Sequence, residues 1–299
     1  MPVFDINEIS KESSTIYYDC LKKMKESEDN LILKELKEYK YVKPKLNLEL
    51  FKDDFDIELL KIDNALNYYF KKKNKKNDTV VLMLHGGGYV LPVSQNNIIG
   101  ATLYSKYINS CDVLLPDYKV ASEDIHMVAL NNVYNSYSYL TKRYNKIVLA
   151  GQSAGGNLAL GLLEYLKENN IKLPNCVVLA SPWTDYNCVG ASYTFNKLED
   201  ILFGTKKEDV LPDPYNKIHD KYMFPLEFNM EIYPPIMINV SKTERLLSDS
   251  LSLYDKLDKE KSEIYLYPLM WHDFYTHDDK LKECNDCWNR INKFVNKFI

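Results

Sequence analysis

The sequence predicts an α/β protein in which a parallel sheet carries helices on both faces. From about residue 79 onward, continuous apolar runs of strand length alternate with longer stretches of helix-like apolar spacing. Strands that are apolar at every position are buried on both faces, and such strands separated by helices are typical of a parallel sheet. Glycine gives a second indication, because six of only 10 glycines lie in two clusters that directly follow two of these runs, at 86–88 and 151–156.

The order of the elements follows from the same patterns. Before residue 50 the chain is polar and charged, with helix-like spacing at Ile16, Cys20 and Met24 and again at Leu33 and Leu36, and Pro44 ends this pattern. Strands are expected at 55–62, 65–70, 79–85, 111–118, 145–151, 175–181, 235–240 and 263–268. Helices are expected at about 97–109, 126–143, 154–169, 248–260 and 281–298.

The stretch at about 187–230 interrupts this alternation. It is long and aromatic, it contains Pro212, Pro214 and Pro225, and it lies between two predicted strands. An insert there would lie above the carboxyl ends of the strands, where open α/β sheets bind their ligands. Its length favours a lid or cap over a plain surface loop.

Length and charge exclude several classes of protein. A chain of 299 residues fits one domain with an insert or cap. A formal net charge of −4 gives no basic surface for nucleic acid. No apolar run is long enough to span a bilayer, so no integral membrane segment is expected. The N-terminus lacks the apolar stretch of a secretory signal, so a cytoplasmic protein is expected. The oligomeric state stays open, with a homodimer among the alternatives.

The six cysteines are expected to be reduced thiols rather than a disulfide framework. Cys284 and Cys287 form a C-x-x-C pattern within a predicted helix. Two thiols on one helix are favoured over a zinc or redox site, because a C-x-x-C pattern on its own within a helix is weak evidence for either.

The strongest chemical signal is the run GQSAG at 151–155, between a predicted strand and a predicted helix. In this context a G-x-S-x-G motif forms a sharp turn that exposes a serine nucleophile, here Ser153. Gly151 and Gly155 permit the turn, and the N-terminus of the helix favours a developing negative charge nearby. The alternative, that Ser153 only caps the helix, does not account for the two glycines.

A second run, HGGG at 85–88, ends another predicted strand. It matches the loop that donates an oxyanion hydrogen bond in esterases. We expect the N–H groups of Gly86 or Gly87, together with that of Ala154, to form an oxyanion hole. His85 precedes the nucleophile, so its ring is expected to hold this loop rather than to act as the base.

The base is expected late in the chain, because the order in this class of hydrolase is serine, acid, histidine. Only His272 and His277 follow the last predicted strand. His272 lies just beyond that strand and can reach back to the serine, whereas His277 lies among charged residues and is expected at the surface. A histidine must be neutral to act as a base. With an ordinary pKa, the rate at low substrate concentration is therefore expected to rise with pH through about 6 to 7.

The acid is expected in the loop after the strand at 235–240. Glu244 lies in that loop, and Asp249 lies where the next helix begins and needs a cap. A carboxylate at the start of a helix is explained by capping, so Glu244 is predicted to orient the imidazole and stabilise its charged form. Asp249 is the alternative.

Taken together, these residues resemble the hormone-sensitive-lipase-like carboxylesterases of the α/β-hydrolase superfamily, from about residue 79 to the end. The resemblance rests on HGGGY at 85–89, DYKVASE at 117–123, GQSAGGNLA at 151–159, SPWTD at 181–185 and WHDF at 271–274. It implies an α/β-hydrolase core at 51–299 with about eight strands, and a helical cap built from 1–50 and the insert at about 187–230. It implies no metal or organic cofactor.

Three positions depart from the family pattern. Gln152 stands where aspartate usually precedes the nucleophile, Ser122 stands where proline precedes the glutamate, and Glu244 stands where aspartate is usual. No member of the triad is lost, but the substrate preference of the family cannot be transferred.

The prediction is a serine carboxylesterase that hydrolyses small esters through an acyl-enzyme. Bulk at the expected pocket, from Tyr89, Trp183 and Phe203, predicts a preference for short acyl groups; the alternative is that these aromatic residues pack the cap against the core. Two rival functions are an amide-cleaving hydrolase such as an arylformamidase and a non-catalytic receptor on the same fold. The presence of both Ser153 and His272 argues against the receptor.

Overall fold

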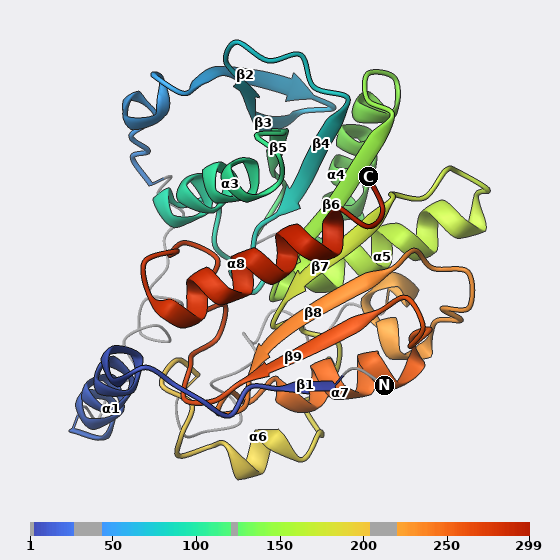
Figure 1. Ribbon diagram of the computed structural model, residues 1–299. Coiled ribbons are helices and arrows are strands. Elements are labelled where there is room, and N and C mark those ends of the chain that lie inside the picture. Colours follow the sequence, from blue (N-terminus) through green and yellow to red (C-terminus); the bar gives the residue numbers. More distant parts are fainter. Residues whose placement is uncertain (1–2, 27–43, 121–124, 204–219) are drawn as a thin grey trace.

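A single sheet of nine strands organises the described part of the chain, in the order β1-β9-β8-β7-β6-β4-β5-β3-β2 (Figure 1). The computed structural model describes residues 3–26, 44–120, 125–203 and 220–299. Neighbours from β1 through to β5 in this order are parallel, and only β3 and β2 run antiparallel to their neighbours. The predicted α/β class with a mostly parallel sheet is confirmed.

Every strand and helix expected from the sequence is present within a few residues. The strands are β1 (Val3–Asp5), β2 (Phe55–Ile62), β3 (Ala65–Lys72), β4 (Thr79–Leu84), β5 (Asp112–Asp117), β6 (Lys146–Gln152), β7 (Cys176–Ala180), β8 (Ile236–Ser241) and β9 (Glu263–Tyr267). The helices are α1 (Lys11–Glu26), α3 (Gln95–Tyr107), α4 (Ile125–Thr141), α5 (Ala154–Glu168), α6 (Ser192–Phe195), α7 (Leu247–Lys256) and α8 (Lys282–Val295). Short 3₁₀ turns are η1 (Glu49–Phe51), η4 (Lys221–Met223) and η5 (Pro225–Glu227).

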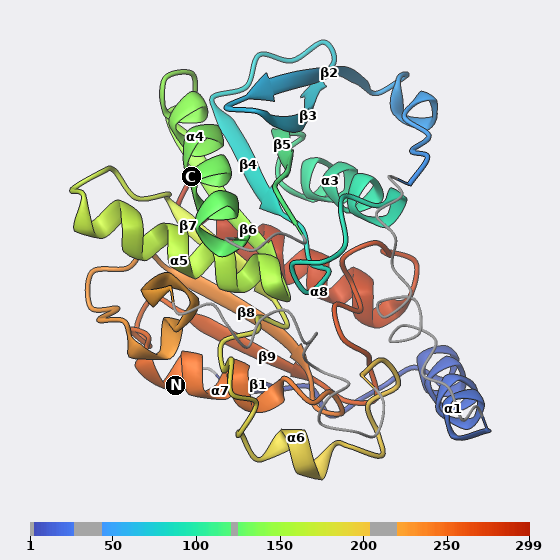
Figure 2. The ribbon, with the colours of Figure 1, turned by 180° about the vertical axis from the view of Figure 1, so that it is seen from behind.

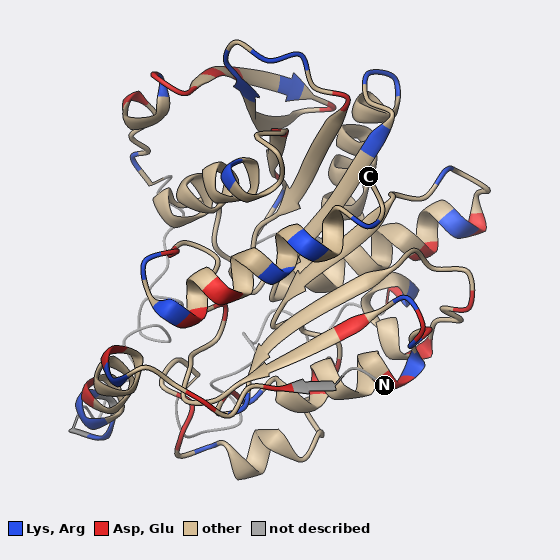
Figure 3. Cartoon of the chain, viewed as in Figure 1, with Lys and Arg blue, Asp and Glu red and all other residues tan. Residues whose placement is uncertain are grey.

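Helices cover both faces of the sheet. α3 and α8 lie on one face of the sheet (Figure 1), where side chains such as Val81 and Met83 point. α4, α5 and α7 lie on the other face (Figure 2), where side chains such as Val80 and Leu82 point. Successive side chains of a strand point to opposite faces, which explains why the central strands are apolar at every position. β4, β7 and β8 accordingly carry no charged residue (Figure 3).

The carboxyl ends of β4 and β6 define the place where a ligand can bind. β5 lies on one side of β4 and β6 on the other, so the chain reverses its direction of winding between them. Open α/β sheets bind ligands at such a switch point. Leu84 pairs with Gly151, and the loops that follow the two strands therefore leave the sheet side by side.

The N-terminal segment departs from the expectation of an all-helical cap. Val3–Asp5 forms β1 and pairs with β9 at the edge of the sheet. α1 follows, and the Tyr17 hydroxyl donates to the Glu199 carbonyl at 2.9 Å, which links this helix to the stretch after β7. Residues 27–43 lie outside the described residues. The division into cap and core otherwise stays a prediction.

Two smaller expectations concern the helices. All six cysteines are free thiols, and Cys284 and Cys287 are buried on α8 as expected. Burial raises the pKa of both thiols and makes them unreactive. In the described ranges, no helix is long and apolar enough to cross a membrane.

Candidate active site

A cavity of about 480 Å³ lies at the carboxyl ends of the central strands. Its lining includes the glycine loop that follows β4, Ser153 after β6 and His272 after β9. Three segments that are far apart in the sequence therefore meet in one hollow. The volume is within the usual range for a small-molecule site.

Ser153 occupies the sharp turn between β6 and α5. Its φ of 52° and ψ of −118° are unusual for a residue with a side chain, and such conformations persist only where the surroundings enforce them. Here the Ser153 N–H donates to the Ala180 carbonyl at 2.9 Å, and its carbonyl accepts from the Trp183 N–H at 3.1 Å. The side chain makes no capping hydrogen bond to α5, so helix capping does not explain this serine.

The glycine loop presents backbone N–H groups beside Ser153. A Cβ on Gly86 would lie 3.2 Å from the Ser153 Cβ, so the two backbones are in close approach. Gly87 has a φ of 111°, which glycine adopts most easily. Among the described residues, the amides of Gly86, Gly87 and Ala154 donate to no protein acceptor. Gly86 and Gly87 line the cavity, whereas Ala154 is fully buried beside Ser153 and is not among the lining residues.

His85 holds this loop in place, as its position in the sequence suggests. Its ring is fully buried, stacks on Tyr118 with centroids 4.2 Å apart, and donates through Nδ1 to the Gly86 carbonyl at 2.7 Å. In a trans peptide the C=O and the following N–H point in opposite directions. The contact with the Gly86 carbonyl therefore turns the N–H of Gly87 away from His85.

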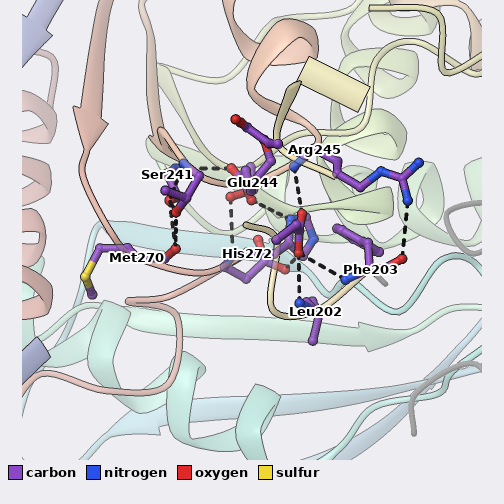
Figure 4. Close-up of polar contacts among 12 residues, drawn as sticks. Leu202, Phe203, Ser241, Glu244, Arg245, Met270 and His272 are labelled. Atoms are coloured by element: carbon purple, nitrogen blue, oxygen red, sulfur yellow. Dashed lines mark hydrogen bonds and ion pairs between the residues drawn. The ribbon is translucent and has the colours of Figure 1, made fainter. Parts of the chain in front are cut away.

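His272 and Glu244 form a buried hydrogen-bonded pair. Nδ1 of His272 lies 2.8 Å from Oε2 of Glu244 (Figure 4). The other carboxylate oxygen of Glu244 accepts from the Ser241 N–H at 3.2 Å. Glu244 is only 1% exposed. A carboxylate in this position fixes the tautomer that leaves Nε2 available to accept a proton.

The loops that carry this pair are tied to each other. The hydroxyls of Ser241 and Thr243 donate to the Met270 carbonyl at 2.9 and 2.8 Å (Figure 4). These bonds join the loop after β8 to the segment that leads into His272. Sequence reasoning did not identify either hydroxyl, although both lie in the SKTE run that contains Glu244.

Two residues of the stretch after β7 also form hydrogen bonds with the loop that contains Glu244. Asn196 donates through Nδ2 to the Glu244 carbonyl at 2.7 Å, and Asp200 accepts from the Arg245 N–H at 2.7 Å. Asp200 also accepts from the N–H groups of Leu202 and Phe203 at 2.8 and 3.0 Å (Figure 4). No sequence motif marks Asn196 or Asp200, because their role depends on contacts with residues more than 40 positions away.

Asp249 does not cap its helix as expected. α7 begins at Leu247, and the Asp249 carboxylate accepts instead from the N–H groups of Thr184 and Asp185, both at 2.7 Å. It therefore connects α7 to the loop after β7. Burial raises the pKa of Asp249 to about 7. The structure places only Glu244, not Asp249, against the imidazole.

Two of the three predicted pocket residues line the cavity. Trp183 and Phe203 do, and the Phe203 ring lies 4.6 Å from the His272 ring. Tyr89 is not among the residues that line the cavity: it is fully buried, and its hydroxyl donates to Asn157 at 2.8 Å. His277 corrects a second expectation, because it lines the cavity and does not lie free on the surface.

Asp273 is a cavity residue that sequence reasoning missed. Its Oδ2 lies 3.5 Å from Nε2 of His272 and 3.3 Å from the position of a Cβ on Gly86. Its φ of 56° is left-handed. Burial raises the pKa of Asp273 to about 7. The WHDF run drew attention to its neighbour, but nothing in the pattern showed that this carboxyl group faces the cavity.

The charge on His272 depends on these neighbours. Burial alone lowers its pKa, but the carboxylates of Asp273 and Glu244 outweigh this effect, with a smaller contribution from Asp200. The net result raises the pKa of His272 to about 9. No hydrogen bond joins Nε2 to a described residue. Catalytic pairs in unliganded enzymes are often farther apart than hydrogen-bonding distance, so Ser153 remains a suitable partner within the shared cavity.

Known proteins share this fold and about a quarter of the aligned residues. The family model described as alpha/beta hydrolase fold matches residues 81–276. An esterase of Acinetobacter venetianus is 26% identical over 228 residues, which span 71% of this chain and 73% of that protein. An acetyl-hydrolase of Streptomyces hygroscopicus is 27% identical over 208 residues, which span 67% of this chain and 69% of that protein.

A crystal structure of an esterase from the bacterial hormone-sensitive lipase family is similar at a TM-score of 0.80. The two chains are 22% identical, and the match covers 98% of this chain and 100% of the other. The resemblance that the glycine and serine motifs indicate is thus confirmed, and the chain belongs to the α/β-hydrolase family.

Proposed function

We propose that this protein is a serine carboxylesterase in which Ser153 is the nucleophile, His272 the base and Glu244 the orienting acid. One observation carries the proposal: a single cavity holds a serine on a strained turn, free N–H groups of a glycine loop and a histidine paired with a buried carboxylate. These are the groups that acyl transfer through a covalent intermediate requires. The names of the related esterase and acetyl-hydrolase support the same class.

In the first half of the reaction, Nε2 of His272 accepts the proton of Ser153, and the serine oxygen attacks the ester carbonyl carbon. The carbonyl oxygen becomes an anion, which the N–H groups of Gly86 or Gly87 and of Ala154 stabilise. His272 then donates the proton to the leaving alcohol as the carbon–oxygen bond breaks. The acyl group remains on Ser153.

In the second half, water takes the place of the alcohol and the same groups release the acid. Glu244 stabilises the imidazolium that forms in each half and keeps the ring in the productive tautomer. All proton transfers pass through Nε2, so the state of His272 sets the dependence of the rate on pH.

We further propose that the N-terminal segment after β1, up to residue 50, and the insert at about 187–230 together form a cap over the cavity. Two contacts support this: Tyr17 of α1 bonds to Glu199 of the insert, and Leu202 and Phe203 of the insert line the cavity. Residues 204–219 lie outside the described residues. The cytoplasmic location stays a prediction from the sequence.

Ser153→Ala should lower the hydrolysis of p-nitrophenyl acetate by about a thousandfold or more, because no other group can form the acyl-enzyme. It should also abolish covalent labelling by a fluorophosphonate. Ser250→Ala is a matched control, since that serine is buried in α7 away from the cavity and should keep both properties. Labelling of Ser153→Ala at the wild-type rate would show that the nucleophile is another residue.

The value of kcat/KM should rise with pH well beyond the window of 6 to 7 that an ordinary histidine predicts. His272 must be neutral to act as a base, and the neighbouring carboxylates raise its pKa to about 9. The neutral fraction, and with it the rate, should therefore increase about tenfold per pH unit up to pH 8. A stopped-flow or initial-rate profile that is already level at pH 7 would contradict this assignment.

Glu244→Gln should lower kcat by about a thousandfold or more with little change in thermal stability, because an amide favours the wrong tautomer of the imidazole. Asp249→Asn should leave kcat nearly unchanged, since its carbonyl oxygen can still accept from both N–H groups. Asp249→Ala removes that acceptor and should cost about 2 to 4 kcal/mol of unfolding free energy, measured by denaturant titration. If Asp249→Asn lost activity and Glu244→Gln did not, Asp249 rather than Glu244 would be the orienting acid.

Esters with acyl groups of two to six carbons should have the highest kcat/KM in a series of p-nitrophenyl esters. The bulk of Trp183 and Phe203 in a cavity of about 480 Å³ is the reason, and dodecanoate should be poorer than butyrate by about tenfold or more. A preference for long chains that increases at an oil interface would be the opposite of the expected result.

A further inference from the structure

The cavity has one apolar wall and one polar wall. The apolar wall comes from Trp183, Leu202 and Phe203, in the stretch that follows β7, and from Leu246 before α7. The polar wall comes from the first turn of α3, the residue before Ser153 and the loop after His272. Its members include Asn97, Gln152, Asp273, Thr276 and His277.

The polar wall is continuous. Asn97 donates through Nδ2 to Oε1 of Gln152 at 3.3 Å. A Cβ added to Gly86 would lie 3.2 Å from the backbone carbonyl oxygen of Gln152 and 3.3 Å from Oδ2 of Asp273, so both oxygens lie beside this glycine. α3 and the loop after His272 are also in close contact, because a Cβ on Gly100 would lie 2.5 Å from the Thr276 carbonyl oxygen.

Two polar atoms of this wall lack a protein partner. Oδ1 of Asp273 and Nε2 of Gln152 are buried and form no hydrogen bond with any described residue. No lysine or arginine is among the described residues that line the cavity, and Asp273 contributes the only carboxyl group among them. Buried polar groups are normally satisfied. A donor on a ligand would complement the carboxylate of Asp273, whereas the Gln152 amide would need an acceptor.

The position of Asp273 shows which part of an ester would meet it. The leaving oxygen takes its proton from Nε2 of His272, and Oδ2 of Asp273 lies 3.5 Å from that nitrogen. Atoms joined to the leaving oxygen are therefore within reach of the Asp273 carboxyl group. The acyl side of the ester must turn toward the amides of the glycine loop and Ala154, which hold the carbonyl oxygen.

The carboxyl group is held by its backbone. The Asp273 N–H donates to the Ser181 hydroxyl at 3.3 Å, and its carbonyl accepts from the N–H and the hydroxyl of Thr276 at 3.0 and 2.9 Å. A group held in this way can discriminate between substrates, because little ordering is needed when the ligand binds.

We propose that Asp273 selects esters whose alcohol part carries a hydrogen-bond donor, a hydroxyl or an ammonium group, a few bonds beyond the leaving oxygen. The inference rests on the proposed esterase activity and names its substrate class. Asp273 is thus a specificity-determining residue of the alcohol side of the cavity.

The test compares acetate esters that differ only in the donor. The hydroxyl arm pairs 2-hydroxyethyl acetate with 2-methoxyethyl acetate. The ammonium arm pairs protonated 2-(dimethylamino)ethyl acetate with its neutral carbon analogue, 3-methylbutyl acetate. In at least one arm, the wild-type enzyme should have a kcat/KM about tenfold or more higher for the donor, the size expected when a buried acceptor gains its hydrogen bond.

Variants then assign the preference to the carboxyl group. Asp273→Gly tolerates the left-handed backbone and removes the side chain, so the ratio of donor to control should fall to about one in both arms. Asp273→Asn keeps an acceptor without the charge, so it should lose the ammonium preference and keep part of the hydroxyl preference. Asp278→Asn, in the same loop but outside the described lining, should leave both ratios unchanged.

Hydrolysis of p-nitrophenyl acetate, which has no donor in its alcohol part, separates the two claims. If the wild-type enzyme does not hydrolyse it, the proposed esterase function fails. If the wild-type enzyme hydrolyses it but both donor ratios are near one, only the role of Asp273 is overturned. Equal ratios in wild-type enzyme and Asp273→Gly would likewise overturn that role, and the wild-type ratios decide the matter even if a variant does not fold.

Discussion

The parallel pairing of β4 with β6 is the constraint on which the rest of the site depends. Leu84 lies opposite Gly151, so the loop that starts at His85 and the turn at Ser153 leave the sheet at the same edge. Gly155 makes this approach feasible, because a Cβ there would lie 2.3 Å from the carbonyl oxygens of both Leu84 and His85. Any change that separates these strands would move the glycine loop away from the serine.

Three carboxyl groups, two of them buried and that of Asp273 partly buried, show how position controls the behaviour of one kind of side chain. Glu244 meets an imidazole, Asp249 meets two backbone N–H groups, and Asp273 faces the cavity with one oxygen unpartnered. A buried carboxylate needs donors or a nearby cation to offset the loss of water. For Asp249 and Asp273 the loss of water outweighs the effect of nearby donors and cations, and burial raises the pKa of each carboxyl group to about 7.

The geometry of the histidine and its acid is set by several segments at once. Hydroxyls of Ser241 and Thr243 connect the two loops, and Asn196 and Asp200 connect the acid loop to the stretch after β7. Asn196 and Asp200 take part in placing Glu244, so the alignment of His272 depends on how the stretch after β7 packs.

The sequence by itself determined the parallel sheet, the helices on its faces and the grouping of Ser153, His272 and the glycine loop. These follow from apolar periodicity and from residues adjacent in the chain, such as the glycines around Ser153, whose effect on the backbone is local. β1 could not be predicted, because a strand of three residues is too short to show an apolar periodicity. Its pairing with β9 also joins residues at opposite ends of the chain.

Only the tertiary structure decided which single side chains face the cavity. Tyr89 lies inside because Asn157 satisfies its hydroxyl there, while His277 and Asp273 line the cavity because α3 packs against their loop. Likewise, both Glu244 and Asp249 were plausible acids until the folded loops placed one against the imidazole and the other against the backbone of residues 184–185. Burial and hydrogen-bond partners depend on contacts between distant segments, and a local pattern of residues does not contain them.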